Sequence, residues 1–437
     1  MPTLTRALGF GLIGLLIFGP LAFGAVESWS IFALEAGAIV LFLLWAARQW
    51  TEREVVLETS PLFGPLLAVA AIWFIQLGIG RSAYPYETLQ EGFLYGCYAL
   101  LVFLSAQYFR GEKRLKRLAV ALSVFGFLFA LFAVIQDFTG NDKIYWLRQP
   151  RSTAWIYGSY VNHNHYAGLI ELLIPFPLIL CMSRWFRDSR RLLFGFAAVV
   201  MGASIFMSLS RGGMVAFLVQ LLFLAACVAF RKQKALVAIL FGIVLVIGGL
   251  LFWLGQQSAL GRLESLRDPM SRGVGASRIR VAQDCLRMWR DRPLLGWGLG
   301  TFVTVFPAYR SSPGSTVMNA AHNDYLEFLV ETGALGLVAL LWFLYRVYAR
   351  GLASARLWNK GVSDAIRFAA LLGCTGILTH GLVDFNLHIP ANAAIFFVLA
   401  GIAASKPRNG NSAGEALETS ERQGSWGGIL KSVVLGR

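Results

Sequence analysis

Residues 192–230 read LLFGFAAVVMGASIFMSLSRGGMVAFLVQLLFLAACVAF. Two apolar runs, 192–209 and 213–230, stand on either side of a short polar tip that contains Arg211. Each run holds 18 residues, close to the roughly 20 that an α-helix needs to cross about 30 Å of hydrocarbon. In lipid, only helices or closed barrels satisfy the backbone hydrogen bonds. The stretch therefore predicts a helical hairpin through a membrane, with Arg211 as its only charge at one edge.

The rest of the chain repeats this pattern. Hydrophobic residues make up 57% of the 437 residues and charged residues only 14%, against about 25% charged in soluble domains. The sequence thus predicts an all-α, polytopic integral membrane protein with about 12 transmembrane helices and one large periplasmic loop. The predicted spans are 7–26, 29–47, 62–80, 89–109, 118–137, 165–182, 192–209, 213–230, 235–254, 325–348, 365–384 and 391–404.

Lysines and arginines set the predicted topology. They gather in alternate short loops, near 48–54, 110–117, 184–191, 231–234 and 346–360, and again just after residue 404. By the positive-inside rule these loops are cytoplasmic. Both termini are then cytoplasmic, and the long loop faces outward. The predicted segments are spans one to nine in 1–254, the periplasmic loop in 255–324, spans ten to twelve in 325–404 and a disordered cytoplasmic tail in 405–437.

The net charge of +15 does not indicate a nucleic-acid-binding protein. A nucleic-acid site gathers its cations on one soluble face, whereas here they are spread over loops between apolar runs. The cysteines predict no disulfide framework, because four of the five lie inside apolar runs.

The longest interruption of hydrophobicity, residues 256–323, holds nine arginines and no lysine. A guanidinium forks two N–H donors at a phosphate or carboxylate, which lysine does not do, so the loop is predicted to hold an anion. Residues 277–290 predict a short amphipathic helix, with Ser277 as its N-cap. The alternative is a surface helix whose arginines reach lipid headgroups.

Local pairing separates the arginines of this helix. Arg280 stands four residues before Asp284. Arg287 stands three residues after Asp284 and four before Asp291. These spacings predict ion pairs on the helix surface. Arg278 has no carboxylate at such offsets and would lie in the first turn, where the helix dipole favours anions. Arg278 is therefore the predicted anion ligand.

Two further residues stand at the outer membrane edge. Arg211 is a functional-site hypothesis because ionisable residues in spans are costly, and the alternative is a side chain that merely reaches the interface. His322 stands at the mouth of the span 325–348, where it is either structural or a general base.

Other polar residues are open to two interpretations. His163 and His165 are predicted to line a cleft, because two histidines without further ligands make a poor metal site. His380 and Asp384, four residues apart on one helical face, form either a supporting pair or ordinary packing. The outward loops contain no pair of acidic residues that would cage a divalent metal.

Five motifs lie in or beside the predicted outward loops. They are SLSRGG at 208–213, SRI at 277–279 with PLLGWG at 293–298, HN-x9-G-x-x-G at 322–336, NHNHYA at 162–167 and VDFN at 383–386. Together they resemble the O-antigen ligase and O-antigen polymerase family of bacterial inner-membrane glycosyltransferases. The resemblance extends over most of the chain from about residue 160.

The resemblance implies a GT-C-like architecture and transfer of a glycan from undecaprenyl diphosphate to an acceptor hydroxyl at the periplasmic face. It assigns the donor diphosphate to Arg211 and Arg278 and acceptor activation to His322. The chemistry agrees, since a leaving diphosphate needs concentrated positive charge and imidazole, with an ordinary pKa of about 6.5, suits a general base. Further substrate-binding candidates are Asn323, His163, His165, Arg280 and Asp384.

The first interpretation is an O-antigen ligase of lipopolysaccharide biosynthesis, with lipid A–core as acceptor and no metal or cofactor. The alternatives are an O-antigen or exopolysaccharide polymerase, whose acceptor is a second lipid-linked glycan, and a protein O-oligosaccharyltransferase. A transporter of lipid-linked glycan is an alternative of another class. A transporter would place its charges near the bilayer midplane on broken helices, whereas here they gather at one edge.

Overall fold

The computed structural model describes residues 2–52, 57–140, 142–150, 155–183, 188–229, 274–311 and 317–405, with the isolated positions 185, 242 and 249. The predicted span at 235–254 (apart from two glycines), the basic loop at 231–234, the long loop up to 273 and the tail from 406 lie outside the described residues. The segment boundaries that depend on them stay predictions.

Every regular element in the described residues is a helix, which confirms the all-α prediction. The α-helices are α1 (Pro2–Leu21), α2 (Ser28–Glu52), α3 (Phe63–Gly78), α4 (Pro85–Tyr108), α5 (Glu112–Phe138), α6 (His163–Leu173), α7 (Pro175–Met182), α8 (Asp188–Met207), α9 (Arg211–Ala229), α11 (Val274–Asp291), α12 (Phe302–Val305), α13 (Asp324–Leu357), α14 (Val362–His380) and α15 (Pro390–Ala403). Three short 3-10 helices accompany them, η1 (Phe23–Ala25), η2 (Phe306–Ala308) and η3 (Asn386–His388).

Within these ranges, nine helical stretches are long and apolar enough to cross a membrane, and α6 with α7 forms one of them. Two further apolar helices, α3 and α15, are shorter. Eleven of the twelve predicted runs thus coincide with helices. The count of twelve is not established, because the run at 235–254 lies outside the described residues.

Several predicted ends are wrong, because helices continue past the apolar run. The helix α2 was expected to end at residue 47 and runs on to Glu52, where Arg48 and Glu52 form an i,i+4 ion pair of 2.9 Å. The helix α5 begins at Glu112, inside the basic cluster that the sequence suggested was a loop. Lys, Arg, Glu and Leu are all good helix formers, so charge alone does not end a helix at the membrane edge.

Pro175 and Pro177 in the sequence predict a kink in the sixth span, and the helix is interrupted there. The helix α6 ends at Leu173 and α7 begins at Pro175, with Ile174 between them. Pro175 and Pro177 have no backbone N–H to continue the ladder, and the proline ring clashes with the preceding turn.

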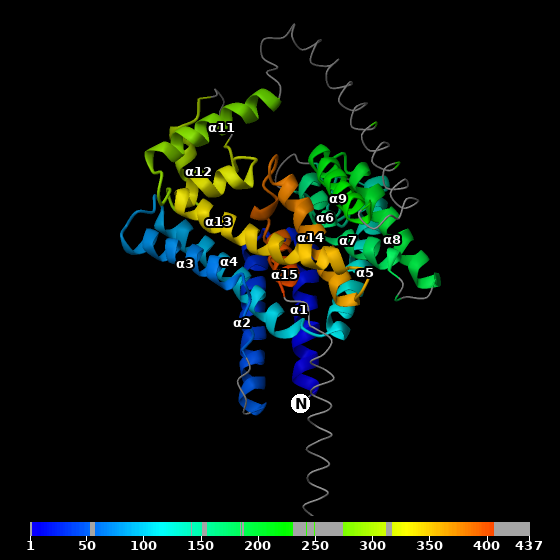
Figure 1. The fold of residues 1–437 in the computed structure, drawn as a ribbon. Helices are drawn as coiled ribbons and strands as arrows, with labels where there is room; N and C mark the ends of the chain where they lie inside the picture. The colour runs from blue at the N-terminus through cyan, green and yellow to red at the C-terminus, as the bar shows by residue number, and fades with distance from the viewer. Residues whose placement is uncertain are drawn as a thin grey trace, which may run out of the picture. The chain divides into compact units, whose positions relative to one another are not determined.

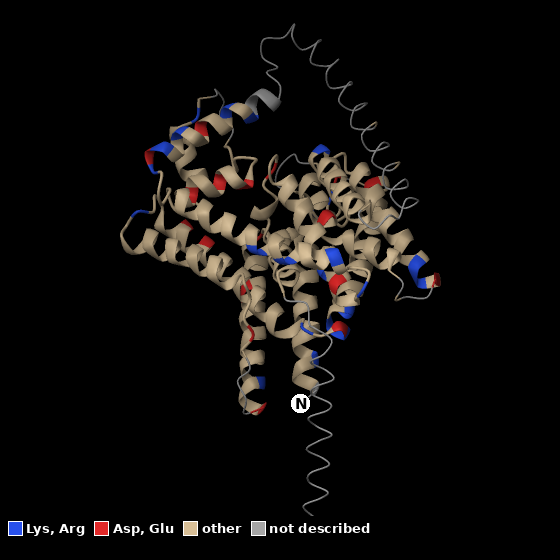
Figure 2. Cartoon of the chain, in the orientation of Figure 1, with Lys and Arg blue, Asp and Glu red and all other residues tan. Residues whose placement is uncertain are grey.

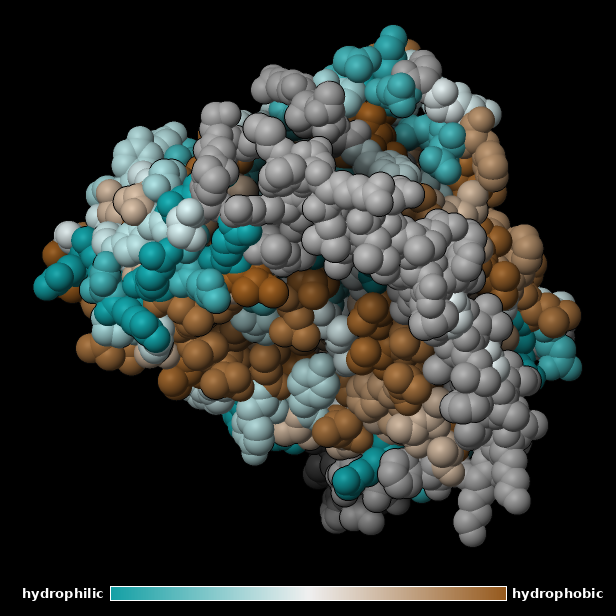
Figure 3. All heavy atoms as spheres, turned by 90° about the horizontal axis from the view of Figure 1, so that it is seen from above, coloured by the Kyte–Doolittle hydropathy of each residue, from teal (hydrophilic) through white to brown (hydrophobic). Residues whose placement is uncertain are grey.

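The helix α14 lies at the centre of the bundle (Figure 1) and packs against α6, α7, α9, α13 and α15. The outward faces of the other spans are apolar. Phe10, Phe32, Leu67 and Val199 are each at least 69% exposed, and brown apolar side chains cover much of the face seen from above, between hydrophilic patches (Figure 3). Such exposed apolar side chains fit lipid contact.

The described loops contact one another in two groups. In the first group, Arg110 forms an ion pair with Glu58, and Arg346 of α13 donates to Pro61 O. Both contacts join segments from the predicted cation-rich side to the loop before α3. The other group joins the predicted outward loops through Glu27–Arg148, Ala83–Trp297 and His163–Ser208. This grouping agrees with the alternation of basic loops. Which group faces the cytoplasm stays a prediction.

The helix α13 is broken at Gly333, whose φ of +68° lies in the left-handed region. A Cβ at this position would stand 2.3 Å from the backbone of Leu294. The long loop uses the break, since Ala334 N donates to Pro293 O at 2.8 Å. Two further bonds, Trp297 N to Val330 O and Gly298 N to Glu331 O, extend the pairing. The second half of the long loop is thus hydrogen-bonded along the N-terminal part of α13.

Gln76 of α3 completes this junction from inside the bundle. Its Nε2 donates to Leu295 O at 2.6 Å and to Glu331 O at 2.8 Å, and its side chain is fully buried. Backbone freed by a broken helix must find such partners in a membrane. From the sequence alone, Gly333 and Gly336 would permit close packing on a neighbouring span. In the structure Gly333 meets the loop and Gly336 meets Thr332 of its own helix.

Gly333→Ala is expected to destabilise the protein by about 2 kcal/mol or more, through a strained φ and a backbone clash. The measurement is the midpoint of thermal unfolding in detergent, which should fall. Gly78→Ala is the matched control, because nothing lies within 4 Å of a Cβ there. Equal midpoints for the two variants would contradict the proposed role of the Gly333 break.

Candidate active site

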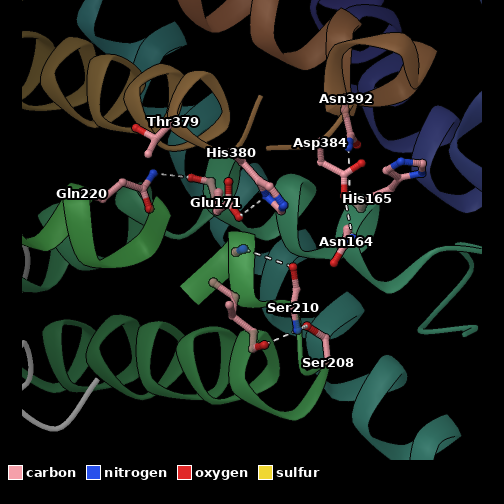
Figure 4. Close-up of polar contacts among 12 residues, drawn as sticks. Asn164, His165, Glu171, Ser208, Ser210, Gln220, Thr379, His380, Asp384 and Asn392 are labelled. Carbon is pink, nitrogen blue, oxygen red and sulfur yellow. Dashed lines mark hydrogen bonds and ion pairs between the residues drawn. The ribbon is translucent and has the colours of Figure 1, made fainter. Parts of the chain in front are cut away.

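Asp384 lies in the turn after α14 and is 1% exposed. Its oxygens accept from Asn164 Nδ2 at 2.6 Å and Phe385 N at 2.9 Å, and His322 Nδ1 lies 3.3 Å away. Figure 4 shows Asn164 beneath the carboxylate. Burial alone would raise the pKa of Asp384, but the hydrogen bond with His322, the nearby imidazoles and the backbone N–H hold that pKa below its ordinary value. The carboxylate is therefore ionised and can only accept.

His322 stands immediately before α13, and its φ of +53° is uncommon for a residue with a side chain. Because the Asp384 carboxylate accepts, Nδ1 of His322 carries the hydrogen and Nε2 keeps its lone pair. The His322 side chain is 36% exposed, and Nε2 has no hydrogen-bond partner among the described residues. A base atom is thus fixed in orientation and open to a substrate.

Asn323 is the N-cap of α13. Its Oδ1 accepts from Leu326 N at 2.9 Å and its Nδ2 donates to Leu382 O at 2.8 Å. Both ends of the amide are occupied, and they join the start of α13 to the turn that carries Asp384. In this structure Asn323 contributes by holding His322 in place.

His163 and His165 both belong to the first turn of α6 but serve different contacts. His163 Nδ1 lies 2.6 Å from Ser208 O, and its ring is stacked on Trp155 at 5.1 Å. His165 is 7% exposed and packs edge-on against Phe385. The two rings therefore brace the start of α6 against the Arg211 tip and against the turn beside His322.

Arg211 begins α9 and is exposed. The next residue, Gly212, would bring a Cβ to 2.6 Å from His380 Nε2 and 3.2 Å from Val383. The tip of the hairpin thus lies against the end of α14, next to the turn that carries Asp384. Arg211 makes no hydrogen bond or ion pair with the described residues.

The helix α11 lies over the approach to His322. Val281, Cys285 and Met288 pack with Phe302, Phe306, Val330 and Ala321, the residue before His322. In Figure 2 blue bands mark α11 and red bands mark the first turns of α13. The prediction that Ser277 caps this helix is wrong, because α11 begins at Val274. Arg278 consequently lies in the second turn, one turn before Val281, and the helix dipole contributes less there.

The predicted ion pairs of α11 are mostly wrong. Asp284 is 1% exposed and accepts from Arg287 and from Ser311 N, not from Arg280. Burial opposes its charge, but these donors hold the pKa of Asp284 below its ordinary value. Asp291 accepts from Tyr309 in place of Arg287. Arg278 and Arg280 both lack a partner among the described residues.

Of the two interpretations of His380 and Asp384, the supporting pair is not formed. The ring of His380 points into the bundle and contacts Glu171 at 2.8 Å, whereas Asp384 faces His322. The reason is that α14 ends at His380, so the two side chains leave in different directions although Asp384 N still donates to His380 O.

A protein family described as O-antigen ligase matches residues 173–341, somewhat less than half of the chain. The match supports the O-antigen ligase family for this segment. The matched segment contains Arg211, α11 and His322, and Asp384 lies beyond it. No curated protein matches the chain. Proteins of the O-antigen ligase family are membrane enzymes that work on glycans, and the match supports an enzyme here.

Sequence reasoning missed two polar residues that lie near Asp384 and the start of α13. Asn164, which holds Asp384, stands inside the motif at 162–167, and that motif was its only signal. His388 was not noticed at all. Its Nδ1 lies 2.9 Å from Asp324 Oδ1 and its Nε2 lies 3.3 Å from Glu327 Oε1. Burial opposes its charge, but Glu327 and Asp324 hold the pKa of His388 well above its ordinary value.

A small apolar cavity of about 80 Å³ lies beside this cluster, with Asp324 and His388 in its wall. Helices α3, α4, α13 and α15 enclose it. The apolar lining includes Leu66, Val69, Phe343, Leu378 and Phe396. Ligand pockets typically span about 300–1,000 Å³, so this cavity is smaller than a ligand pocket.

Proposed function

We propose that this membrane enzyme transfers a glycan from undecaprenyl diphosphate to an acceptor hydroxyl at the periplasmic face. The observation that carries the proposal is the His322–Asp384 pair at 3.3 Å beside the Arg211 tip. It joins an oriented base with an unpaired guanidinium at one edge of a bundle of membrane-spanning helices. The match to the O-antigen ligase family supports the same reaction class.

In the proposed reaction, His322 Nε2 takes the proton of the acceptor hydroxyl as its oxygen attacks the anomeric carbon of the glycan. The bond from that carbon to the diphosphate oxygen breaks, and the electron pair leaves with undecaprenyl diphosphate. Arg211 and Arg278 stabilise the charge that grows on the diphosphate. Asp384 keeps Nδ1 of His322 protonated and stabilises the imidazolium, which then releases its proton to solvent.

A lipid-linked donor fits the surroundings of this site. The spans carry exposed apolar side chains, among them Phe32, Leu67 and Val199, against which a long hydrocarbon chain can lie. Burial of a prenyl chain is favourable by about 0.8 kcal/mol of free energy for each CH₂ removed from water. The proposal therefore combines a lipid tail held by helices with a diphosphate at their outer edge.

Among acceptors we favour lipid A–core, which makes the enzyme an O-antigen ligase of the bacterial inner membrane with both termini cytoplasmic. The polymerase and the protein O-oligosaccharyltransferase follow, because the same base serves any hydroxyl. A transporter is disfavoured, since its charges would be expected near the bilayer midplane on broken helices, whereas Arg211 and His322 lie at the ends of spans. Purified enzyme offered one defined donor with each acceptor in turn decides among them by product mass. Release of intact donor across vesicles without any product would favour the transporter.

Arg211→Lys and Arg278→Lys are each expected to slow transfer about 10- to 1,000-fold, or about 1.4 to 4 kcal/mol of barrier. Lysine keeps the charge but loses the planar fork that grips a diphosphate. The two losses should not add in the double variant, because both act on one leaving group. The measurement is the initial rate with saturating acceptor.

Arg287→Lys and Arg290→Lys are the matched controls on α11 and should stay within a few-fold of wild type. Arg287 is engaged by Asp284, and Arg290 lies in the last turn. Arg280→Lys is tested together with Arg211→Lys and Arg278→Lys, because Arg280 does not form its predicted ion pair with Asp284. Equal losses in all five lysine variants would show a diffuse positive field in place of two specific ligands.

Transfer is expected to survive excess EDTA, because the outward loops offer no acidic pair that would cage a divalent cation. The measurement is the rate with purified enzyme before and after chelation. Activity that disappears with EDTA and returns with Mg²⁺ or Mn²⁺ would overturn the metal-free reaction.

A further inference from the structure

Three polar side chains meet inside the bundle behind Arg211. They are Glu171 of α6, Gln220 of α9 and His380 of α14, and they are 0%, 4% and 1% exposed. Placing such groups among membrane-spanning helices is costly unless they are paired. None of them takes part in the proposed proton transfer. Their presence therefore needs another explanation.

Two sets of contacts join these three helices (Figure 4). His380 Nδ1 lies 2.8 Å from Glu171 Oε1, which joins α14 to α6. Gln220 Nε2 donates at 2.8 Å to the carbonyl oxygens of both Glu171 and Leu372, which joins α9 to α6 and α14. We call these three residues the polar staple.

Each of the three helices also carries part of the proposed site. The helix α6 begins next to Asn164, which donates to Asp384. The helix α9 begins with Arg211. The helix α14 ends at His380, and Asp384 follows with its N–H bonded to His380 O at 3.0 Å. A shift among these helices would change the distance from Arg211 to Asp384 and its partner His322.

The staple lies directly against the first turn of α9. A Cβ at Gly212 would stand 2.6 Å from His380 Nε2, and one at Gly213 would stand 3.2 Å from Glu171 Oε1. Two glycines are thus needed for α9 to approach so closely. His380 Nε2 and Glu171 Oε2 have no partner among the described residues, so the alignment of the pair depends on its one mutual contact. Directional polar contacts of this kind fix register in a way that apolar packing does not.

We propose that Glu171, Gln220 and His380 are positioning residues that fix the start of α9 against the end of α14, and thereby set Arg211 relative to Asp384 and His322. The inference rests on the proposed function, in which Arg211 holds the donor diphosphate. On this account, three residues that contact neither donor nor acceptor also determine the transfer rate.

The kinetic test compares His380→Leu, Glu171→Leu and Gln220→Leu with Glu171→Gln. The leucine variants should lower kcat about 10- to 100-fold, since a displacement near 1 Å at a reacting centre costs up to about that factor, with donor KM little changed. Glu171→Gln keeps an oxygen acceptor for His380 and should retain most activity.

Thr375→Val is the control, because it removes a different polar contact of α14, with Tyr348. In a cycle with Arg211→Lys, the His380→Leu loss should shrink, while Thr375→Val should combine independently.

A second measurement is independent of activity. Spin labels at Val215 and Leu382, both exposed, report the distance from α9 to the turn after α14 in a cysteine-free background. The distribution should be narrow in wild type, Glu171→Gln and Thr375→Val, and broader or shifted in the leucine variants. If one leucine variant does not fold, the other two still test the proposal.

The outcomes separate the two claims. A distance that changes in the leucine variants while Arg211→Lys transfers normally would support the staple and remove the proposed role of Arg211. Loss of transfer in Arg211→Lys, with unchanged distance and kcat in the leucine variants, would overturn the staple and leave the proposed function standing. Equal effects of Thr375→Val and His380→Leu would also overturn the staple, because any polar deletion in α14 would then suffice.

Discussion

His322→Ala is expected to slow glycan transfer about 10²- to 10⁴-fold, the usual contribution of a general base. The variant removes Nε2, the one nitrogen of this ring without a partner among the described residues. The measurement is kcat with purified enzyme and a defined lipid-diphosphate glycan. Donor affinity should stay nearly unchanged, because the diphosphate is held by arginines in the proposed site.

The control for His322→Ala is the same preparation, assayed for thermal unfolding in detergent and for donor binding. Both should resemble wild type, since the His322 side chain is 36% exposed and lies at the start of α13, outside the helical bundle's buried core. Near-normal turnover in a folded, donor-binding variant would return His322 to a structural role and leave the reaction without its base.

Asp384→Asn is expected to cost about 10²- to 10⁴-fold in kcat, by analogy with loss of the carboxylate that orients a catalytic histidine. The carboxylate can only accept, so it fixes the hydrogen of His322 on Nδ1. An amide can present its NH₂ group instead, which would place the lone pair on Nδ1 and the hydrogen on Nε2. Because the pKa of Asp384 lies below its ordinary value, the carboxylate is ionised throughout the neutral range, and the deficit should not vary with pH there.

Asp364→Asn is the matched control for Asp384→Asn. Asp364 also forms an ion pair, with Arg367 at 3.4 Å, but at the opposite end of α14. It should leave kcat within a few-fold of wild type. Equal losses for the two variants would mean that α14 needs its carboxylates for folding and that Asp384 has no specific link to His322.

The membrane-spanning helices could be predicted because their signal is local. Run length alone places a helix such as α9 in lipid, and Pro175 alone predicts the break between α6 and α7. Arg211 and His322 could be singled out as well, since a charge at a hairpin tip and a histidine before a span are visible in the sequence.

What the sequence did not predict depends on contacts between distant segments. Asp384 was paired with His380 on spacing alone, but the end of α14 turns one side chain inward and the other toward His322. Asp284 was paired with Arg280, although tertiary packing buries it against Ser311. The break at Gly333 was missed, because only the approach of Leu294, 39 residues earlier in the chain, requires it.

The central claim is that His322 activates an acceptor hydroxyl against a lipid-diphosphate glycan. The most direct measurement incubates purified wild-type and His322→Ala enzyme with one defined undecaprenyl-diphosphate glycan and lipid A–core, and follows both products by mass. The account predicts glycosylated acceptor and free undecaprenyl diphosphate in equal amounts from wild type, and a rate at least about 10²-fold lower from the variant. Equal rates from the two enzymes, or consumption of donor without glycosylated acceptor, would contradict it.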